Sequence, residues 1–126
     1  MKRIPAGNVE FWAEVRESGG DGGPSIQVRT AIDGHDVQLL RFDCFRKRPH
    51  YHYAPGGENA GYDIDPTIVE DSLGWTLSQL RANLRAMVGR AGYPTVAESL
   101  DPSAIASGLA EVEAHLLASL SAAKLT

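Results

Sequence analysis

The sequence predicts an α+β protein with two layers. We expect a curved antiparallel sheet of about four strands, followed by two helices that pack on one face of the sheet. Two observations lead to this expectation. Apolar and polar residues alternate over the first half of the chain, which is typical of half-buried strands. Apolar residues then recur every three or four positions over the second half, which is typical of amphipathic helices.

The first predicted strand covers residues 9–16. Its apolar side chains share one side, and Trp12 shares the other side with charged residues. The glycine-rich segment 18–24, SGGDGGP, predicts a flexible turn after it.

Two further strands are expected in the first half of the chain. Residues 26–32 alternate, and Asp33-Gly34 then favours a type I′ hairpin turn, because both of its positions need positive φ. The next strand runs from about Asp36 to Phe45. With a fourth strand that ends at Tyr53, the predicted sheet spans about residues 9–53.

The helices are expected at about residues 66–91 and 102–122, after a loop at 54–64. Asp-Pro pairs supply a cap and a first-turn proline at both starts. Gly92 predicts the end of the first helix. The apolar stripe of the first helix consists of Leu73, Leu77, Leu80, Leu84, Met87 and Ala91. The stripe of the second consists of Ile105, Leu109, Val112, Leu116 and Leu120.

Length and composition indicate one globular domain over residues 1–126. The formal net charge of −4 disfavours a protein that binds nucleic acid over its whole surface. Cys44 is the single cysteine, which fits a reducing compartment. No signal peptide or membrane span is visible, so we expect a cytoplasmic protein that does not bind membranes.

The most informative stretch is Pro49-His50-Tyr51-His52-Tyr53. As a strand it places both histidines on one face and both tyrosines on the other. A hairpin that opposes Asp43 to His52 would give the sheet an apolar side toward the core. Its other side would carry Arg41, Asp43, His50 and His52.

That polar side has three interpretations. His50 and His52, with Asp43 as a third ligand, can hold a divalent metal such as zinc. A histidine activated by Asp43 can instead act as a catalytic general base. The third interpretation is a solvated hairpin face, where Asp43 pairs with a histidine.

Other residues are candidates for binding a partner. Arg46, Lys47 and Arg48, with Arg41 nearby, form a basic tip that can hold phosphate or RNA, with Tyr51 or Tyr53 to stack bases.

Two features indicate that something covers the outer sheet face. Trp12 lies among charged residues there, and the strand at residues 36–45 begins with apolar side chains on both sides. A homodimer, or docking on a larger protein, would explain both features. A β-bulge together with one isolated tryptophan would explain them equally well.

Three short motifs resemble a family of small uncharacterised bacterial domains with no established activity. They are Pro49 to Tyr53, Asp65-Pro66-Thr67, and Gly74-Trp75-Thr76-Leu77 with Arg81, and the resemblance as a whole covers about half of the chain. In addition, Phe42-Asp43 followed by His50-x-His52 is similar to the aromatic–aspartate strand and histidine-rich turn of TumE-type toxins. The helical half of the chain does not share the pattern of these toxins.

The sequence therefore leads to two functional hypotheses. The first is a non-enzymatic binding or accessory module that dimerises or docks through its outer sheet face. The second is a histidine-dependent hydrolase or ribonuclease of toxin type, metal-assisted in one version, that uses Asp43, His50 and His52.

Overall fold

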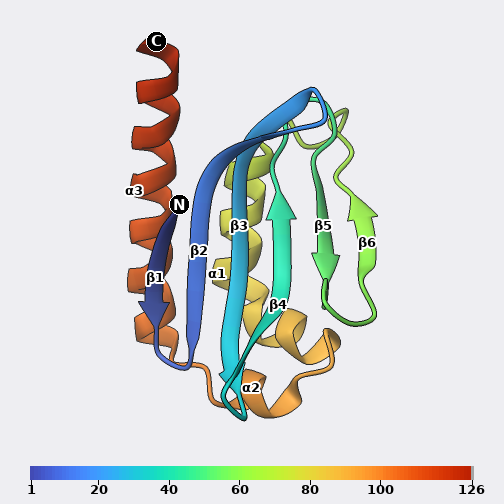
Figure 1. Ribbon diagram of the computed structural model, residues 1–126, viewed down its shortest axis with the longest axis vertical. Coiled ribbons are helices and arrows are strands. Elements are labelled where there is room, and N and C mark those ends of the chain that lie inside the picture. The colour runs from blue at the N-terminus through green and yellow to red at the C-terminus, as the bar shows by residue number, and fades with distance from the viewer. Residues whose placement is uncertain (126) are drawn as a thin grey trace.

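The computed structural model describes residues 1–125, and it confirms the α+β class (Figure 1). Its sheet has six antiparallel strands in the order β1-β2-β3-β4-β5-β6, each beside its neighbour in sequence. The strands are β1 (Lys2–Ala6), β2 (Val9–Ser18), β3 (Asp21–Ile32), β4 (His35–Asp43), β5 (His50–Tyr53) and β6 (Ala60–Asp63). Sequence reasoning missed β1 and β6, because each is short and carries few apolar residues.

The hairpin between β2 and β3 is tighter than predicted. Its turn consists of Gly19 and Gly20, which have φ of 58° and 82°, and both strands continue up to it. The segment that we expected to be a flexible turn is therefore mostly strand. Two consecutive residues with positive φ are the requirement of a type I′ turn, and glycine meets it without steric strain.

Three helices lie on one face of the sheet: α1 (Ser72–Arg90), α2 (Pro94–Glu98) and α3 (Pro102–Leu125) (Figure 1). Helix α1 begins six residues later than its predicted start at residue 66. Asp71 is its N-cap and accepts a hydrogen bond from the backbone of Gly74. No side chain between residues 66 and 71 is buried, so this stretch lacks an apolar face to pack as a helix.

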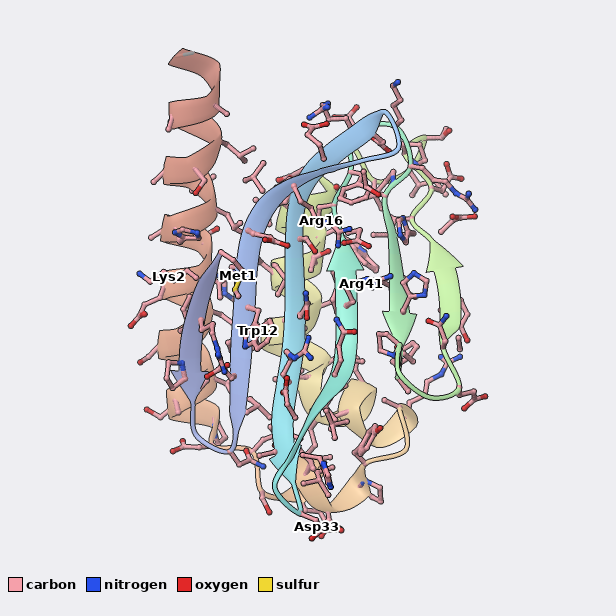
Figure 2. All side chains as sticks on the ribbon, in the orientation of Figure 1. Met1, Lys2, Trp12, Arg16, Asp33 and Arg41 are labelled. Carbon is pink, nitrogen blue, oxygen red and sulfur yellow. The ribbon has the colours of Figure 1, made fainter. Side chains whose placement is uncertain are left out.

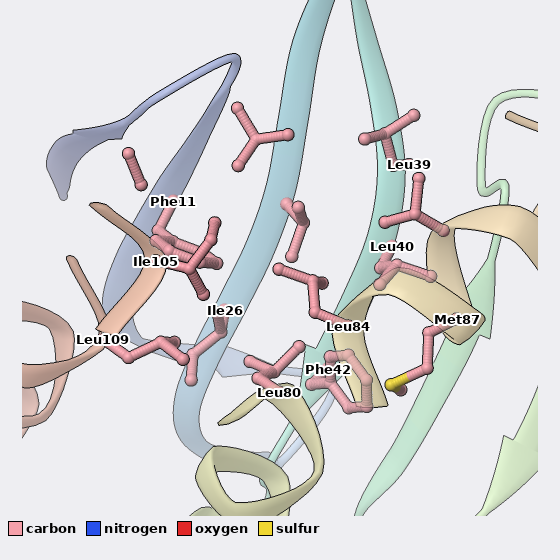
Figure 3. Close-up of a cluster of buried hydrophobic side chains, with 14 of the residues drawn as sticks. Phe11, Ile26, Leu39, Leu40, Phe42, Leu80, Leu84, Met87, Ile105 and Leu109 are labelled. Carbon is pink, nitrogen blue, oxygen red and sulfur yellow. The ribbon is translucent and has the colours of Figure 1, made fainter. Parts of the chain in front are cut away.

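Helix α3 covers β1 and β2, and α1 covers β4 and β5. Figure 3 shows the side chains that fill the space between the layers. The largest fully buried ones include Phe11, Ile26, Leu40, Phe42, Leu80 and Leu109. Within the described chain, no helix combines the length and apolar character needed to cross a membrane.

The β4–β5 hairpin has the predicted faces but a different register. Asp43 lies opposite His50, Phe42 opposite Tyr51 and Arg41 opposite His52. This register differs by two residues from the predicted pairing of Asp43 with His52. A shift of two preserves which side chains share a face, so the alternating pattern cannot distinguish the two registers.

The apolar start of β4 is explained by a β-bulge. The pairing of β3 with β4 shifts between Val28 and Arg29, so that Val28 opposes Leu40 and Arg29 opposes Gln38. Leu39 has no partner in this register, and both Leu39 and Leu40 are fully buried in the core cluster. An extra residue in one strand lets two successive side chains reach the same layer.

Candidate functional site

The candidate site lies on the outer face of the sheet, the face turned away from the helices. Figure 2 shows Trp12, Arg16 and Arg41 on this face. The strand pairing places Arg41 beside His52 and Asp43 beside His50. We call Arg41, Asp43, His50 and His52 the Asp43 centre.

Asp43 is the anchor of the Asp43 centre and is 3% exposed. Its Oδ1 accepts a hydrogen bond of 2.8 Å from the Ser25 hydroxyl, on the neighbouring strand β3. Its Oδ2 lies 3.1 Å from His50 Nε2 and 3.1 Å from Arg41 Nε. A buried carboxylate needs such partners, because an unpaired buried charge is costly.

His50 is held at both ring nitrogens. Its Nδ1 lies 2.9 Å from the backbone carbonyl of Arg48. A carbonyl oxygen can only accept, so Nδ1 carries a proton. The Nε2 atom then faces Asp43 either with a second proton or with a lone pair aimed at a cation that both groups share.

His52 stands in a different environment from His50. Its Nδ1 is buried and has no hydrogen-bond partner within the described chain. Burial lowers the pKa of His52, and the nearby charges of Arg41 and His50 lower it further. The ring of His52 lies over Gly61 of β6, where a Cβ atom would approach its Cε1 and Nδ1 at 3.2 Å.

One ligand atom from each of Asp43, His50 and His52 lies within 4.8 Å of the others. In a tetrahedral zinc site with ligand atoms about 2 Å from the ion, two ligand atoms lie roughly 3.3 Å apart. The separations in the Asp43 centre therefore need to close by up to about 1.5 Å for one zinc ion to bind all three residues. The three residues proposed as metal ligands from the sequence thus come together, although in the shifted register.

Asp21 supports the Asp43 centre and was missed by sequence reasoning. Its carboxylate accepts hydrogen bonds from the backbone N–H groups of Gly22, Lys47 and Arg48 at 2.8 to 2.9 Å. Although burial raises the pKa of Asp21, these backbone hydrogen bonds lower it overall. Because Arg48 in turn holds His50, Asp21 fixes the loop that orients the histidine. An aspartate inside a glycine-rich turn was the available signal.

Gly23 also helps to position the loop between β4 and β5. Gly23 has a φ of 152°, and a Cβ atom there would clash with the carbonyl of Cys44. The close approach allows Cys44 N–H to donate to the Pro24 carbonyl at 2.7 Å. The chain after β4 is thus held against β3 up to the start of the basic tip.

The basic tip does not form one concentrated positive patch. Arg46 pairs with Glu17 at 3.3 Å, Arg48 pairs with Asp63 at 3.2 Å, and Lys47 Nζ donates to the Gly20 carbonyl. Tyr51 and Tyr53 do not lie beside it. They face the helix layer, in an aromatic cluster with Phe42, Tyr62 and Trp75. RNA binding by the tip together with these tyrosines stays a prediction.

Trp12 lies between two arginines. The Arg3 and Arg29 guanidinium groups lie 4.6 and 3.9 Å from its ring centroid, and its Nε1 donates to Glu10. The two arginine side chains therefore cover part of the Trp12 ring, which we had expected a partner to cover. The β-bulge accounts for the second feature that suggested an interface. Docking of a second copy or a larger partner here stays a prediction.

Cys44 faces the helix layer and does not belong to the Asp43 centre. Burial raises the pKa of its thiol to about 11. The sulfur lies 3.4 Å from Thr76 Oγ1. A protonated, buried thiol of this kind is a poor nucleophile.

Comparison with known proteins identifies the family. The family model of a domain of unknown function, DUF7700, matches residues 3–116, so the chain belongs to that family. No curated protein and no solved structure matches the chain. Membership of an uncharacterised domain family is thus confirmed. The resemblance to a bacterial family through the three motifs, and the similarity to TumE-type toxins, stay predictions.

Proposed function

We propose that this member of the DUF7700 family is a metal-binding domain. It holds a divalent transition-metal ion such as zinc with Asp43, His50 and His52. The observation that carries the proposal is the convergence of their three ligand groups within 4.8 Å on the outer sheet face. Imidazole and carboxylate groups are common zinc ligands, and two histidines at alternate positions of one strand can reach one ion.

The contacts of His50 favour a metal ligand over a catalytic general base. A general base needs one ring nitrogen for its carboxylate and the other for the substrate. Both nitrogens of His50 are engaged within the protein, one by Asp43 and one by the Arg48 carbonyl. A metal-bound histidine commonly donates its second N–H to a carbonyl, which orients the ring.

The contacts of Asp43 also favour a role as a metal ligand. The Ser25 hydroxyl occupies Oδ1, which leaves Oδ2 directed toward His50. The competitor for Oδ2 is Arg41, at 3.1 Å. Its Nε has no aligned hydrogen bond to any described residue, so this contact is an ion pair of poor geometry. An incoming divalent ion therefore displaces a weak contact.

Three protein ligands leave a coordination position for water or for another molecule. This is the arrangement of catalytic zinc sites, where the ion activates a bound water molecule. The hydrolase and ribonuclease hypothesis therefore depends on the same three residues. A binding or accessory role for the domain is equally compatible with a bound ion.

The test is elemental analysis of tag-free protein, combined with titration of the protein with Co²⁺. We expect one equivalent of metal per chain, with the absorption spectrum of a nitrogen- and oxygen-ligated cobalt ion. The double variant His50→Ala/His52→Ala should lose metal affinity by more than about 100-fold, because it removes two of the three ligands.

The chain offers a matched control, His35→Ala/His115→Ala, which removes the two histidines outside the Asp43 centre. This variant should bind metal like the wild type. Equal affinity of both double variants, or no stoichiometric binding by the folded wild type, would overturn the proposal. Circular dichroism of each variant shows whether it is folded.

A further inference from the structure

Arg41 has no role as a metal ligand, yet it lies inside the Asp43 centre. It stands on β4 directly opposite His52, and its side chain is 29% exposed. The carboxylate oxygen that it contacts, Asp43 Oδ2, also contacts His50. Asp43 Oδ2 is therefore a shared contact of the Arg41 guanidinium and the His50 ring.

A metal ion changes the charge balance around Arg41. If Asp43 Oδ2 binds the ion, the Arg41 guanidinium loses its ion pair with this oxygen. A divalent ion, one carboxylate, two neutral imidazoles and one guanidinium then carry a formal net charge of about +2. Half-buried charge of this size is costly unless an anion compensates it.

An open space lies beside the two histidines on the β5–β6 side of the Asp43 centre, whereas Arg41 and Asp43 lie on β4. An open depression of about 330 Å³ is lined by Arg48, His50, His52, Gly61, Tyr62 and Asp63. Asp63 would repel an anion, but the Arg48 guanidinium pairs with it at 3.2 Å. Because Gly61 has no side chain, the ring of His52 can lie over it at the edge of the depression.

We infer that the metal-loaded Asp43 centre binds a phosphate group, through the open metal position and the Arg41 guanidinium. The inference rests on the proposed metal site. A phosphate monoester carries about two negative charges at neutral pH, which matches the uncompensated charge. Guanidinium groups also bind phosphate oxygens with paired, directional hydrogen bonds. The ligand is either inorganic phosphate or the phosphate of a larger ester.

The experiment measures coupling between the two ligands by calorimetry. Inorganic phosphate and glycerol phosphate are each titrated into metal-free protein and into Co²⁺-loaded protein. We expect phosphate affinity to rise at least about 10-fold with the metal, and metal affinity to rise by the same factor with phosphate. Coupling with glycerol phosphate alone would identify an ester as the ligand, and coupling with both would identify the phosphate group itself.

Variants of Arg41 separate this inference from the proposed function. Arg41→Gln should retain Co²⁺ binding and lose most of the coupling, whereas Arg41→Lys should keep part of it. The matched control is Arg29→Gln, which removes an arginine of the same sheet face that pairs with Asp36 at 2.9 Å. It should leave the coupling unchanged.

Three outcomes are decisive. If the folded wild type binds no metal, the proposed function fails and the phosphate inference fails with it. If it binds metal without any coupling to phosphate, only the inference fails. Equal coupling in the wild type and in Arg41→Gln also overturns the inference, since the anion would then be bound without Arg41.

Discussion

The outer sheet face carries two polar clusters that differ in how well their polar atoms are satisfied. We call Arg3, Glu10, Trp12, Arg29 and Asp36 the Trp12 cluster. In it, Arg3 pairs with Glu10, Arg29 pairs with Asp36, and the indole N–H donates to Glu10. Each charged group of the Trp12 cluster therefore has an opposite partner on the face itself.

The Asp43 centre is built from similar residue types but is incomplete. Arg41 Nε and His52 Nδ1 are buried without a hydrogen bond to any described residue. Among the described residues, Asp43 alone supplies a negative charge to Arg41 and His50. Buried polar atoms are nearly always satisfied in native proteins, by protein groups, water or a bound ion, so these two atoms fit a centre that takes up a further partner. The comparison supports the proposal that the Asp43 centre binds a ligand, whereas the charged groups of the Trp12 cluster are paired with one another.

The largest effect is expected for Asp43→Ala, with Asp36→Ala as its counterpart in the Trp12 cluster. Both aspartates are on β4 and pair with an arginine, but the Asp43 side chain is 4% exposed and that of Asp36 is 52% exposed. Loss of Asp43 should lower the free energy of unfolding by about 2 to 3 kcal/mol, because Arg41, His50 and Ser25 lose a buried partner. Loss of Asp36 should cost less than about 1 kcal/mol. Urea denaturation measures both, and equal costs would contradict the distinction between the clusters.

A smaller effect is expected for Asp21→Ala, which tests whether the loop before β5 organises the Asp43 centre. The variant removes three hydrogen-bond acceptor contacts, and the resulting freedom of Arg48 loosens the orientation of His50. We expect Co²⁺ affinity to fall about 10-fold, the effect typical of residues behind the metal ligands. Asp33→Ala, in the turn between β3 and β4, is the control and should leave metal affinity unchanged. An unchanged affinity in Asp21→Ala would show that the loop has no part in metal binding.

We also expect an effect on stability, but not on metal binding, for Trp12→Ala. Loss of two cation–π contacts should lower the free energy of unfolding by about 1 to 2 kcal/mol, without a change in metal affinity. Light scattering of the same variant tests whether the outer face is an interface. A decrease in molar mass relative to the wild type would establish Trp12 as a partner contact, and the Trp12 cluster would then be more than a structural device.

The sequence by itself determined which side chains share a face of the β4–β5 hairpin. Strict alternation allows one assignment with the tyrosines toward the core, and the structure has Tyr53 buried there and the histidines outside. The change of period after the predicted loop likewise indicated that helices follow the strands, although α1 begins at Ser72 and not at residue 66, and β6 was missed. These features follow from local geometry, because the side chains of strands and helices repeat at fixed intervals.

Tertiary structure decided the strand register, the position of the β-bulge and the hydrogen bonding of the Asp43 centre, because the alternation of apolar and polar residues does not specify them. The register of β4 against β5 is set by the loop that Asp21 and the close approach at Gly23 hold against β3, and these contacts join residues more than 20 positions apart. The bulge at Leu39 is set by the pairing of β4 with β3. The unsatisfied atoms of Arg41 and His52 result from burial and hydrogen-bond geometry that depend on four neighbouring strands. The sequence could therefore nominate Asp43, His50 and His52, but only their packing showed that one carboxylate oxygen joins His50 and Arg41.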